Sequence, residues 1–368
     1  MINEAKLPQR AKKIRRATAE IEKILEGYGY TEVYLPLYEY YDILSKTAWD
    51  FSDENIIRFI DRNTGKSMVL RPDFTPQVCR NVANYFNSYP RPIRLSYKGR
   101  IFRNVNTNKG LKSEMQQIGL ELFGEEELFG DLELINIGYK CLLALGIQEF
   151  KIVFTDIFFL KEVLNLIDNN ENYLNLIETK NYSEIEKFLN SAGISTDRHE
   201  LFSTFAKCYG GFEILSDIRE KVSFSKELQS RIDELASLHN NLVELGVSSD
   251  KIVFDLSETS GINYYTGINV KFIGQRGNIL ASGGRYDNIM RNFGINISAC
   301  GLAFNLEEIL TVYGFNETKV EVDYLVIGKD NFKKAEELRK KGFKVLWVSD
   351  KDKLQKPEIV YDIKNILS

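Results

Sequence analysis

Three polar side chains, Arg103, Gln117 and Glu121, lie within or directly after two strand-like segments whose other residues are typical of a protein core. The segments Ile93–Phe102 and Met115–Phe123 flank a polar loop and predict a long antiparallel hairpin. Because side chains alternate along a strand, Gln117 and Glu121 share one face of the return strand, and Arg103 continues the outgoing strand. A guanidinium, an amide and a carboxylate are costly on a buried sheet unless they meet a ligand or each other. We therefore predict a binding site on this hairpin. The alternative is a surface hairpin with a solvated polar face.

Two further segments carry side chains that could contact a small ligand. In LRPDFTPQVCR, which spans Leu70–Arg80, Asp73 and Thr75 stand just before a predicted helix. Asp73 is suited to capping that helix, so a structural role and a binding role are both open. In GINYYTG, the adjacent Tyr264 and Tyr265 fit either the aromatic core of a sheet or the wall of a pocket.

The elements that must position these residues mix strands with helices. Apolar spacing predicts helices at Gln9–Gly27 and Glu126–Leu145 and a strand entering a helix at Gly301–Leu310. Further strands are predicted at Thr31–Leu37, Ile56–Asp61, Ser67–Leu70, Phe150–Thr155, Ile252–Leu256, Asn269–Ile273 and Ile279–Ala281. The pattern favours an α+β fold.

The sequence predicts one large domain, residues 1-320, and a short C-terminal segment, residues 321-368. Within the large domain, residues 157-246 show helical spacing without a strand run and predict a helical insertion. The C-terminal segment has a βαβ pattern, with strands at Tyr324–Ile327, Lys344–Val348 and Glu358–Tyr361.

Composition argues against several classes of function. The 368 residues carry a net charge of −4, and no long basic block marks a nucleic-acid surface. The four cysteines have no paired spacing and suggest buried free thiols, and the two histidines suggest solvated helix residues, so we expect no metal and no cofactor. No stretch of eighteen apolar residues occurs, which predicts a cytoplasmic protein without a membrane partner.

Four ordered segments resemble class II aminoacyl-tRNA synthetases, in their histidyl form. The hairpin resembles motif 2, the Asp73 segment and the GINYYTG segment resemble two histidine-binding segments, and Ser282–Leu310 resembles the segment that ends in motif 3. This resemblance implies an antiparallel sheet flanked by helices, and a homodimer formed through the region Gln9–Pro36. It also implies that free histidine is bound by Asp73, Thr75, Arg103, Gln117, Glu121, Tyr264 and Tyr265. Asp73 and Thr75 would hold the ammonium, Gln117 and Glu121 would read the imidazole, and Arg103 is the remaining candidate for the carboxylate.

The chain departs from the synthetase pattern where adenylate chemistry needs positive charge. Ser260 and Glu308 stand at two positions where the synthetases have arginine, and an anion in place of a cation repels a triphosphate. The C-terminal βαβ segment also resembles only the beginning of a synthetase anticodon-binding domain. No aminoacylation and no tRNA partner are therefore expected.

A synthetase-like chain with these losses resembles the family of ATP phosphoribosyltransferase regulatory subunits, which lack catalytic activity. That resemblance implies a hetero-oligomer with the short-form catalytic subunit, in the first step of histidine biosynthesis, with histidine as effector. Two alternatives remain at this point, namely a histidine–tRNA ligase with an atypical site and a histidine-sensing module with another partner.

Overall fold

The structure is a computed structural model that describes residues 8–45, 53–86, 88–105, 112–314, 319–354 and 360–368. Contacts between Cα atoms divide the chain into two units, Met1–Gly314 and Phe315–Ser368. The division predicted at residue 320 lies six residues beyond this one.

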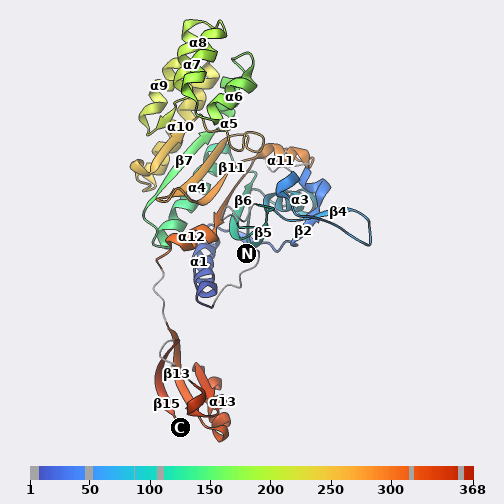
Figure 1. Ribbon diagram of the computed structural model, residues 1–368, viewed down its shortest axis with the longest axis vertical. Coiled ribbons are helices and arrows are strands. Elements are labelled where there is room, and N and C mark those ends of the chain that lie inside the picture. Colours follow the sequence, from blue (N-terminus) through green and yellow to red (C-terminus); the bar gives the residue numbers. More distant parts are fainter. Residues whose placement is uncertain (1–7, 46–52, 87, 106–111, 315–318, 355–359) are drawn as a thin grey trace. The chain divides into compact units, whose positions relative to one another are not determined.

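A nine-stranded sheet forms the centre of the first unit (Figure 1), with strand order β1-β5-β6-β12-β11-β10-β7-β9-β8. In that order the strands are Thr31–Glu32, Ile93–Phe102, Glu114–Phe123, Ala299–Asn305, Ile279–Arg285, Ile268–Gly274, Phe150–Asp156, Ile252–Asp255 and Tyr209–Gly210. Most neighbours are antiparallel, as predicted, but β1 pairs with β5 and β7 pairs with β9 in parallel. The parallel β7–β9 pair requires a long crossover, which the helical segment between these strands supplies.

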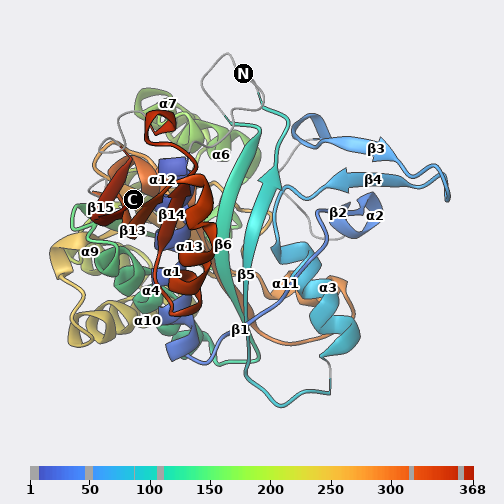
Figure 2. The same ribbon diagram turned by 90° about the horizontal axis from the view of Figure 1, so that it is seen from below.

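The predicted hairpin is present, with β5 and β6 paired in register from Ile93 opposite Phe123 to Phe102 opposite Glu114. Figure 2 shows these two long strands side by side. Most of the loop predicted at Asn104–Ser113 lies outside the described residues.

Side chains alternate along β6, so one face of the strand packs in the core and the other carries polar residues. Ile118, Leu120 and Leu122 join the main hydrophobic core, together with Ile21 of helix α1 (Pro8–Gly27) and Leu134 of helix α4 (Glu127–Ala144). The intervening residues therefore point to the opposite face, which carries Gln117 and Glu121. The main helices of this unit that flank the sheet are α1 Pro8–Gly27, α4 Glu127–Ala144, α11 Asp287–Asn292 and α12 Leu306–Val312.

The segment predicted as a helical insertion contains six helices. They are α5 Ile157–Leu164, α6 Asn170–Glu178, α7 Tyr182–Ser191, α8 Thr196–Phe205, α9 Glu213–Lys221 and α10 Lys226–Glu244. Two sequence-based expectations are wrong here. A short strand, β8, occurs within the segment and pairs with β9. His239 of α10 is buried against the ring of Phe212, with centroids 4.3 Å apart, so it is not a solvated helix residue.

A smaller sheet, β2-β4-β3, lies on one side of the hairpin (Figure 2). Its strands are β2 Tyr38–Tyr40, β3 Arg58–Ile60 and β4 Ser67–Leu70, and the helices beside it are α2 Tyr41–Leu44 and α3 Thr75–Tyr85. The strand predicted at Thr31–Leu37 is limited to β1. The strands predicted at Ile56–Asp61 and Ser67–Leu70 are present as β3 and β4, which pair as an antiparallel hairpin, and β4 leads directly into the segment that carries Asp73.

The C-terminal unit has a three-stranded parallel sheet in the order β14-β13-β15. Its elements are β13 Val320–Ile327, α13 Phe332–Lys340, β14 Val345–Val348 and β15 Tyr361–Leu367. The strand predicted at Glu358–Tyr361 begins outside the described residues, and β15 continues to Leu367 because it pairs along β13.

All four cysteines are buried and free, as predicted. In the described ranges, no helix is long and apolar enough to cross a membrane. The same residues hold no group of three or more histidine, cysteine, aspartate or glutamate side chains that could bind a metal ion.

Candidate functional site

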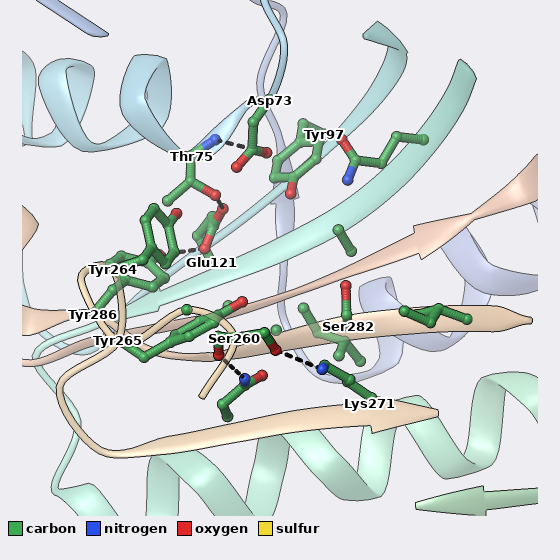
Figure 3. Close-up of a pocket in the computed structure, with 18 of the residues that line it drawn as sticks. Asp73, Thr75, Tyr97, Glu121, Ser260, Tyr264, Tyr265, Lys271, Ser282 and Tyr286 are labelled. Atoms are coloured by element: carbon green, nitrogen blue, oxygen red, sulfur yellow. Dashed lines mark hydrogen bonds between the residues drawn. The ribbon is translucent and has the colours of Figure 1, made fainter. Parts of the chain in front are cut away.

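A cavity of about 250 Å³ opens on the face of the large sheet opposite the main core. All seven side chains predicted for the site line it, although they come from three separate parts of the chain. Figure 3 labels Asp73, Thr75, Glu121, Tyr264 and Tyr265 among them. Asp73 and Thr75 come from the start of α3, and Arg103, Gln117 and Glu121 from the hairpin. The loop between β9 and β10 contributes Tyr264 and Tyr265.

The floor of the cavity follows from the register of four neighbouring strands. Across β10, β11, β12 and β6, one row reads Asn269, Gly284, Gly301, Glu121, and the next row on the same face reads Lys271, Ser282, Ala303, Gly119. The two middle strands thus contribute only small residues. Longer polar side chains on β10 and β6 form the two walls, so the sheet has a trough.

Glu121 is the most enclosed charged group in the cavity, with 1% of its surface exposed. Its Oε1 accepts a hydrogen bond of 2.6 Å from Thr75 Oγ1, and its Oε2 accepts one from the hydroxyl of Tyr286. Burial raises the pKa of Glu121 to about 8, with a further contribution from Asp73, although the hydrogen bonds oppose this shift. The carboxyl group is therefore largely protonated at neutral pH.

Asp73 lies both at the beginning of α3 and at the wall of the cavity. Its Oδ1 accepts hydrogen bonds from the backbone N–H groups of Phe74 at 2.6 Å and Thr75 at 3.4 Å, which stabilises the beginning of α3. Its side chain also lines the cavity. Burial raises the pKa of Asp73, and the nearby charge of Arg103 lowers it.

Gln117 has an amide oxygen, Oε1, that is buried and accepts no hydrogen bond from the described residues. A buried acceptor without a donor costs about 1–3 kcal/mol, so such atoms are rare unless a ligand or water supplies the donor. Gln117 lines the cavity and a smaller one of about 150 Å³, whose lining also includes Arg103 and Ser282.

The two tyrosines of the GINYYTG segment stand at right angles to each other, with ring centroids 4.9 Å apart. Gly261 has a φ of +83°, and a Cβ at this position would lie 2.5 Å from the ring of Tyr265. A glycine is therefore needed to turn the chain so that both rings reach the cavity.

Sequence reasoning missed several polar residues of the cavity lining, among them Tyr286 and Lys271. Tyr286 comes from the loop after β11 and donates to Glu121, and Lys271 comes from the middle of β10. Tyr286 lies in a segment that had been matched to the synthetases, so its motif was a usable signal. For Lys271, only the register of β10 against β11 places the side chain in the trough.

Comparisons with known proteins relate the chain to histidyl-tRNA synthetases and to a family of regulatory subunits. The family model for histidyl-tRNA synthetase matches residues 3–309. The ATP phosphoribosyltransferase regulatory subunit of Clostridium acetobutylicum is 32% identical over 301 residues, which cover 79% of this chain and 73% of that protein. The one from Geobacter metallireducens is 30% identical over 309 residues, which cover 83% of this chain and 71% of that protein.

The chain belongs to the family of ATP phosphoribosyltransferase regulatory subunits. This assignment confirms the family that the sequence motifs indicated. As a regulatory subunit, the chain is a non-catalytic component with a role in histidine biosynthesis.

Solved structures confirm the class II synthetase-like fold of this regulatory subunit. An ATP phosphoribosyltransferase regulatory subunit/histidyl-tRNA synthetase from Bacillus halodurans superposes with a TM-score of 0.87 at 22% identity, covering 100% of this chain and 97% of that one. A histidyl-tRNA synthetase from Nostoc sp. gives a TM-score of 0.76 at 18% identity, covering 97% and 86%.

The two positions where the regulatory subunit lacks a synthetase arginine differ in location. Ser260 lines the cavity, whereas Glu308 is absent from the described linings of both the main and the smaller cavity. The backbone N–H of Glu308 instead donates to Asn305 Oδ1 at the beginning of α12. Its neighbour Glu307 is buried and forms ion pairs with Arg10 and Lys112. Glu308 therefore does not lie at the wall of either described cavity, where it was expected to repel a triphosphate.

Proposed function

We propose that the cavity binds free histidine as an effector. The chain would assemble with the short-form catalytic subunit of ATP phosphoribosyltransferase and make its activity depend on histidine. The observation that carries this proposal is the buried Oε1 of Gln117, which needs a donor that the described residues do not supply. The ammonium and the imidazole of histidine are both such donors.

The charges and size of the cavity support an amino acid as ligand. Asp73 and Glu121 offer two carboxyl groups, and Thr75 adds a hydroxyl, so an ammonium and a ring N–H can each find an oxygen acceptor. The volume of about 250 Å³ is below the range of about 300–1,000 Å³ that is typical for drug-sized ligands. A single amino acid suits this space better than a nucleotide.

The residues take the following roles in this proposal. Asp73 and Thr75 bind the ammonium, Glu121 and Gln117 bind the imidazole, and Tyr264 and Tyr265 enclose the ring. Arg103 is the carboxylate partner that sequence reasoning indicates. Because Thr75 and Tyr286 donate hydrogen bonds to Glu121, the fold itself orients this carboxyl group for a ligand.

Histidine can change the activity of the partner only if it binds two states of the assembly unequally, and such couplings are typically about 1–3 kcal/mol. The test mixes both purified subunits and follows phosphoribosyl-ATP formation with and without histidine. We expect the catalytic subunit to require this chain for full activity, and Glu121→Ala to abolish the response to histidine. Glu244→Ala, at an exposed position near the end of α10, serves as the control.

Two results would contradict the proposal. One is that the catalytic subunit alone has the same activity, and the same response to histidine, as the mixture of both subunits. The other is histidine-dependent ATP–pyrophosphate exchange by this chain, which would favour the ligase alternative.

The proposed assembly includes a homodimer of this chain that forms through the region Gln9–Pro36, and the adjoining small sheet would extend the interface. Large apolar side chains are exposed there and on the adjoining small sheet, including Tyr34 at 82%, Tyr38 at 52% and Ile60 at 62%. Tyr38 packs edge-on against Phe59, with centroids 6.3 Å apart, so these apolar groups are partly contiguous. Sedimentation at micromolar concentration should show a dimer that Ile60→Asp weakens, and a stable monomer in the unmodified protein would exclude this interface.

A further inference from the structure

Lys271 is a cation at the wall of the cavity opposite Glu121. It lies on β10, its side chain is 20% exposed, and its Nζ donates to Ser260 Oγ at 2.6 Å and lies 3.3 Å from Glu258 Oε2. Figure 3 shows Lys271, Ser260 and Ser282 on one side of the cavity and Asp73, Thr75 and Glu121 on the other. One side of the cavity therefore presents the ammonium of Lys271, and the other presents two carboxyl groups.

The sheet keeps these two sides apart. Lys271 stands opposite Ser282, Ser282 opposite Ala303, and Ala303 opposite Gly119 on β6, which also carries Glu121. Three strand spacings separate the backbones of β10 and β6 by about 14 Å. Because only small residues lie between them, the ends of the long side chains face each other across open space.

Arg103 does not provide the same charge at the same place. Its Nε donates to the backbone oxygen of Pro72 at 3.2 Å, next to Asp73 in the chain. The guanidinium of Arg103 and the carboxylate of Asp73 thus lie at the same side of the cavity and offset each other. Lys271 is the cation on the other side.

We propose that Lys271 binds the α-carboxylate of the amino acid, and that Ser260 and Glu258 hold the ammonium group of Lys271 in position. This inference rests on the proposed function and moves the carboxylate partner from Arg103 to β10. An ammonium has three N–H donors, and contacts among the described residues account for two, with Ser260 and Glu258. The third is available to a carboxylate, and Ser260 adds a hydroxyl donor beside it. A zwitterion then extends across the trough with its carboxylate at β10.

The experiment compares two ligands that differ only in the carboxylate, L-histidine and histamine. Calorimetry gives the dissociation constant of each for the unmodified chain, Lys271→Met and Lys271→Arg. Lys187→Met is the matched control, since Lys187 also pairs with a glutamate but lies exposed on α7, outside the cavity. A charge-assisted hydrogen bond corresponds to at least about a tenfold change in affinity.

We expect the unmodified chain to bind L-histidine at least about tenfold more tightly than histamine. Lys271→Met should bring that ratio close to one by weakening only L-histidine, and Lys271→Arg should restore most of it. Histamine binding serves as the check on the shape of the cavity.

Three outcomes would overturn the assignment of Lys271. The first is an unchanged ratio of the two affinities in Lys271→Met. The second is an equal loss of affinity for L-histidine and histamine, and the third is a preference for L-histidine that Lys271→Arg does not restore. In these cases the proposed function stands if the unmodified chain binds L-histidine. If it binds neither ligand, the proposed function itself fails.

Discussion

The carboxylate of Glu121 occupies the space that a side chain at Gly301 would need. A Cβ built on Gly301 would lie 1.7 Å from Glu121 Oε2, far inside any allowed contact. The two residues are direct cross-strand partners on β6 and β12, so Gly301 is the reason that Glu121 can lie flat across the floor of the cavity.

Gly301→Ala should therefore displace Glu121 and reduce histidine affinity by at least about tenfold, because the carboxylate loses its alignment with Thr75 and Tyr286. Calorimetry with histidine measures the effect. Gly27→Ala is the matched control, since a Cβ at Gly27 would meet nothing within 4 Å. Unchanged affinity in Gly301→Ala would show that Glu121 does not bind the ligand.

Gln117→Met should have opposite effects on stability and on binding. It removes a buried oxygen that has no donor among the described residues, so the free energy of unfolding of the empty protein should rise by about 1 kcal/mol. Histidine affinity should fall, because the ligand loses an acceptor. Urea denaturation with and without histidine measures both changes, with exposed Gln148→Met as control. A loss of stability in the empty protein would contradict the assignment of Oε1 as an unsatisfied acceptor.

The raised pKa of Glu121 predicts how stability depends on pH. Between the usual value of 4.5 and the folded value of about 8, the folded chain keeps a proton that the unfolded chain releases. The contribution of Glu121 to stability is therefore full below pH 4.5, falls as the pH rises to about 8, and then becomes constant.

Glu121→Gln mimics the protonated form and removes this dependence. The stability of the variant relative to the unmodified chain should increase by up to about 1.4 kcal/mol per pH unit across that interval. Denaturation midpoints at pH 5, 6, 7 and 8 provide the comparison. Parallel pH profiles for the two proteins would mean that Glu121 titrates normally.

Arg231→Met tests how the helical insertion is attached to the sheet. Arg231 of α10 is buried, and its Nε donates to Asp156 Oδ2 at 2.8 Å at the end of β7. Removing one partner leaves the fully buried carboxylate of Asp156 without its counter-ion, so we expect a loss of about 3–5 kcal/mol in the free energy of unfolding.

Two further variants give this result its meaning. Asp156→Asn added to Arg231→Met should recover part of the loss, because it removes the stranded charge. Arg219→Met removes the α9 partner of an exposed ion pair with Asp233 of α10. This variant should lower the free energy of unfolding by less than about 1 kcal/mol. Equal losses in Arg231→Met and Arg219→Met would show that burial of the pair is unimportant.

Local sequence patterns determined the elements and most of the candidate site. The bounds of β5 follow from alternation within one segment, and α1 follows from its apolar period, because both depend on residues that are neighbours in the chain. The seven candidate residues were predicted because each belongs to a short segment that resembles a known motif, and the structure places all seven around one cavity.

Only the tertiary structure decided how distant strands face each other. Lys271 has no motif of its own, and it enters the site because β10 pairs with β11 in one particular register. Gly301 is required because β12 pairs with β6, more than 170 residues away in the chain. Register between such strands depends on long-range packing of both sheet faces, and a shift of one residue would turn each of these side chains to the other face. This is the physical reason that the sequence specified the carboxylates of the site, while the fold alone supplied the opposing cation.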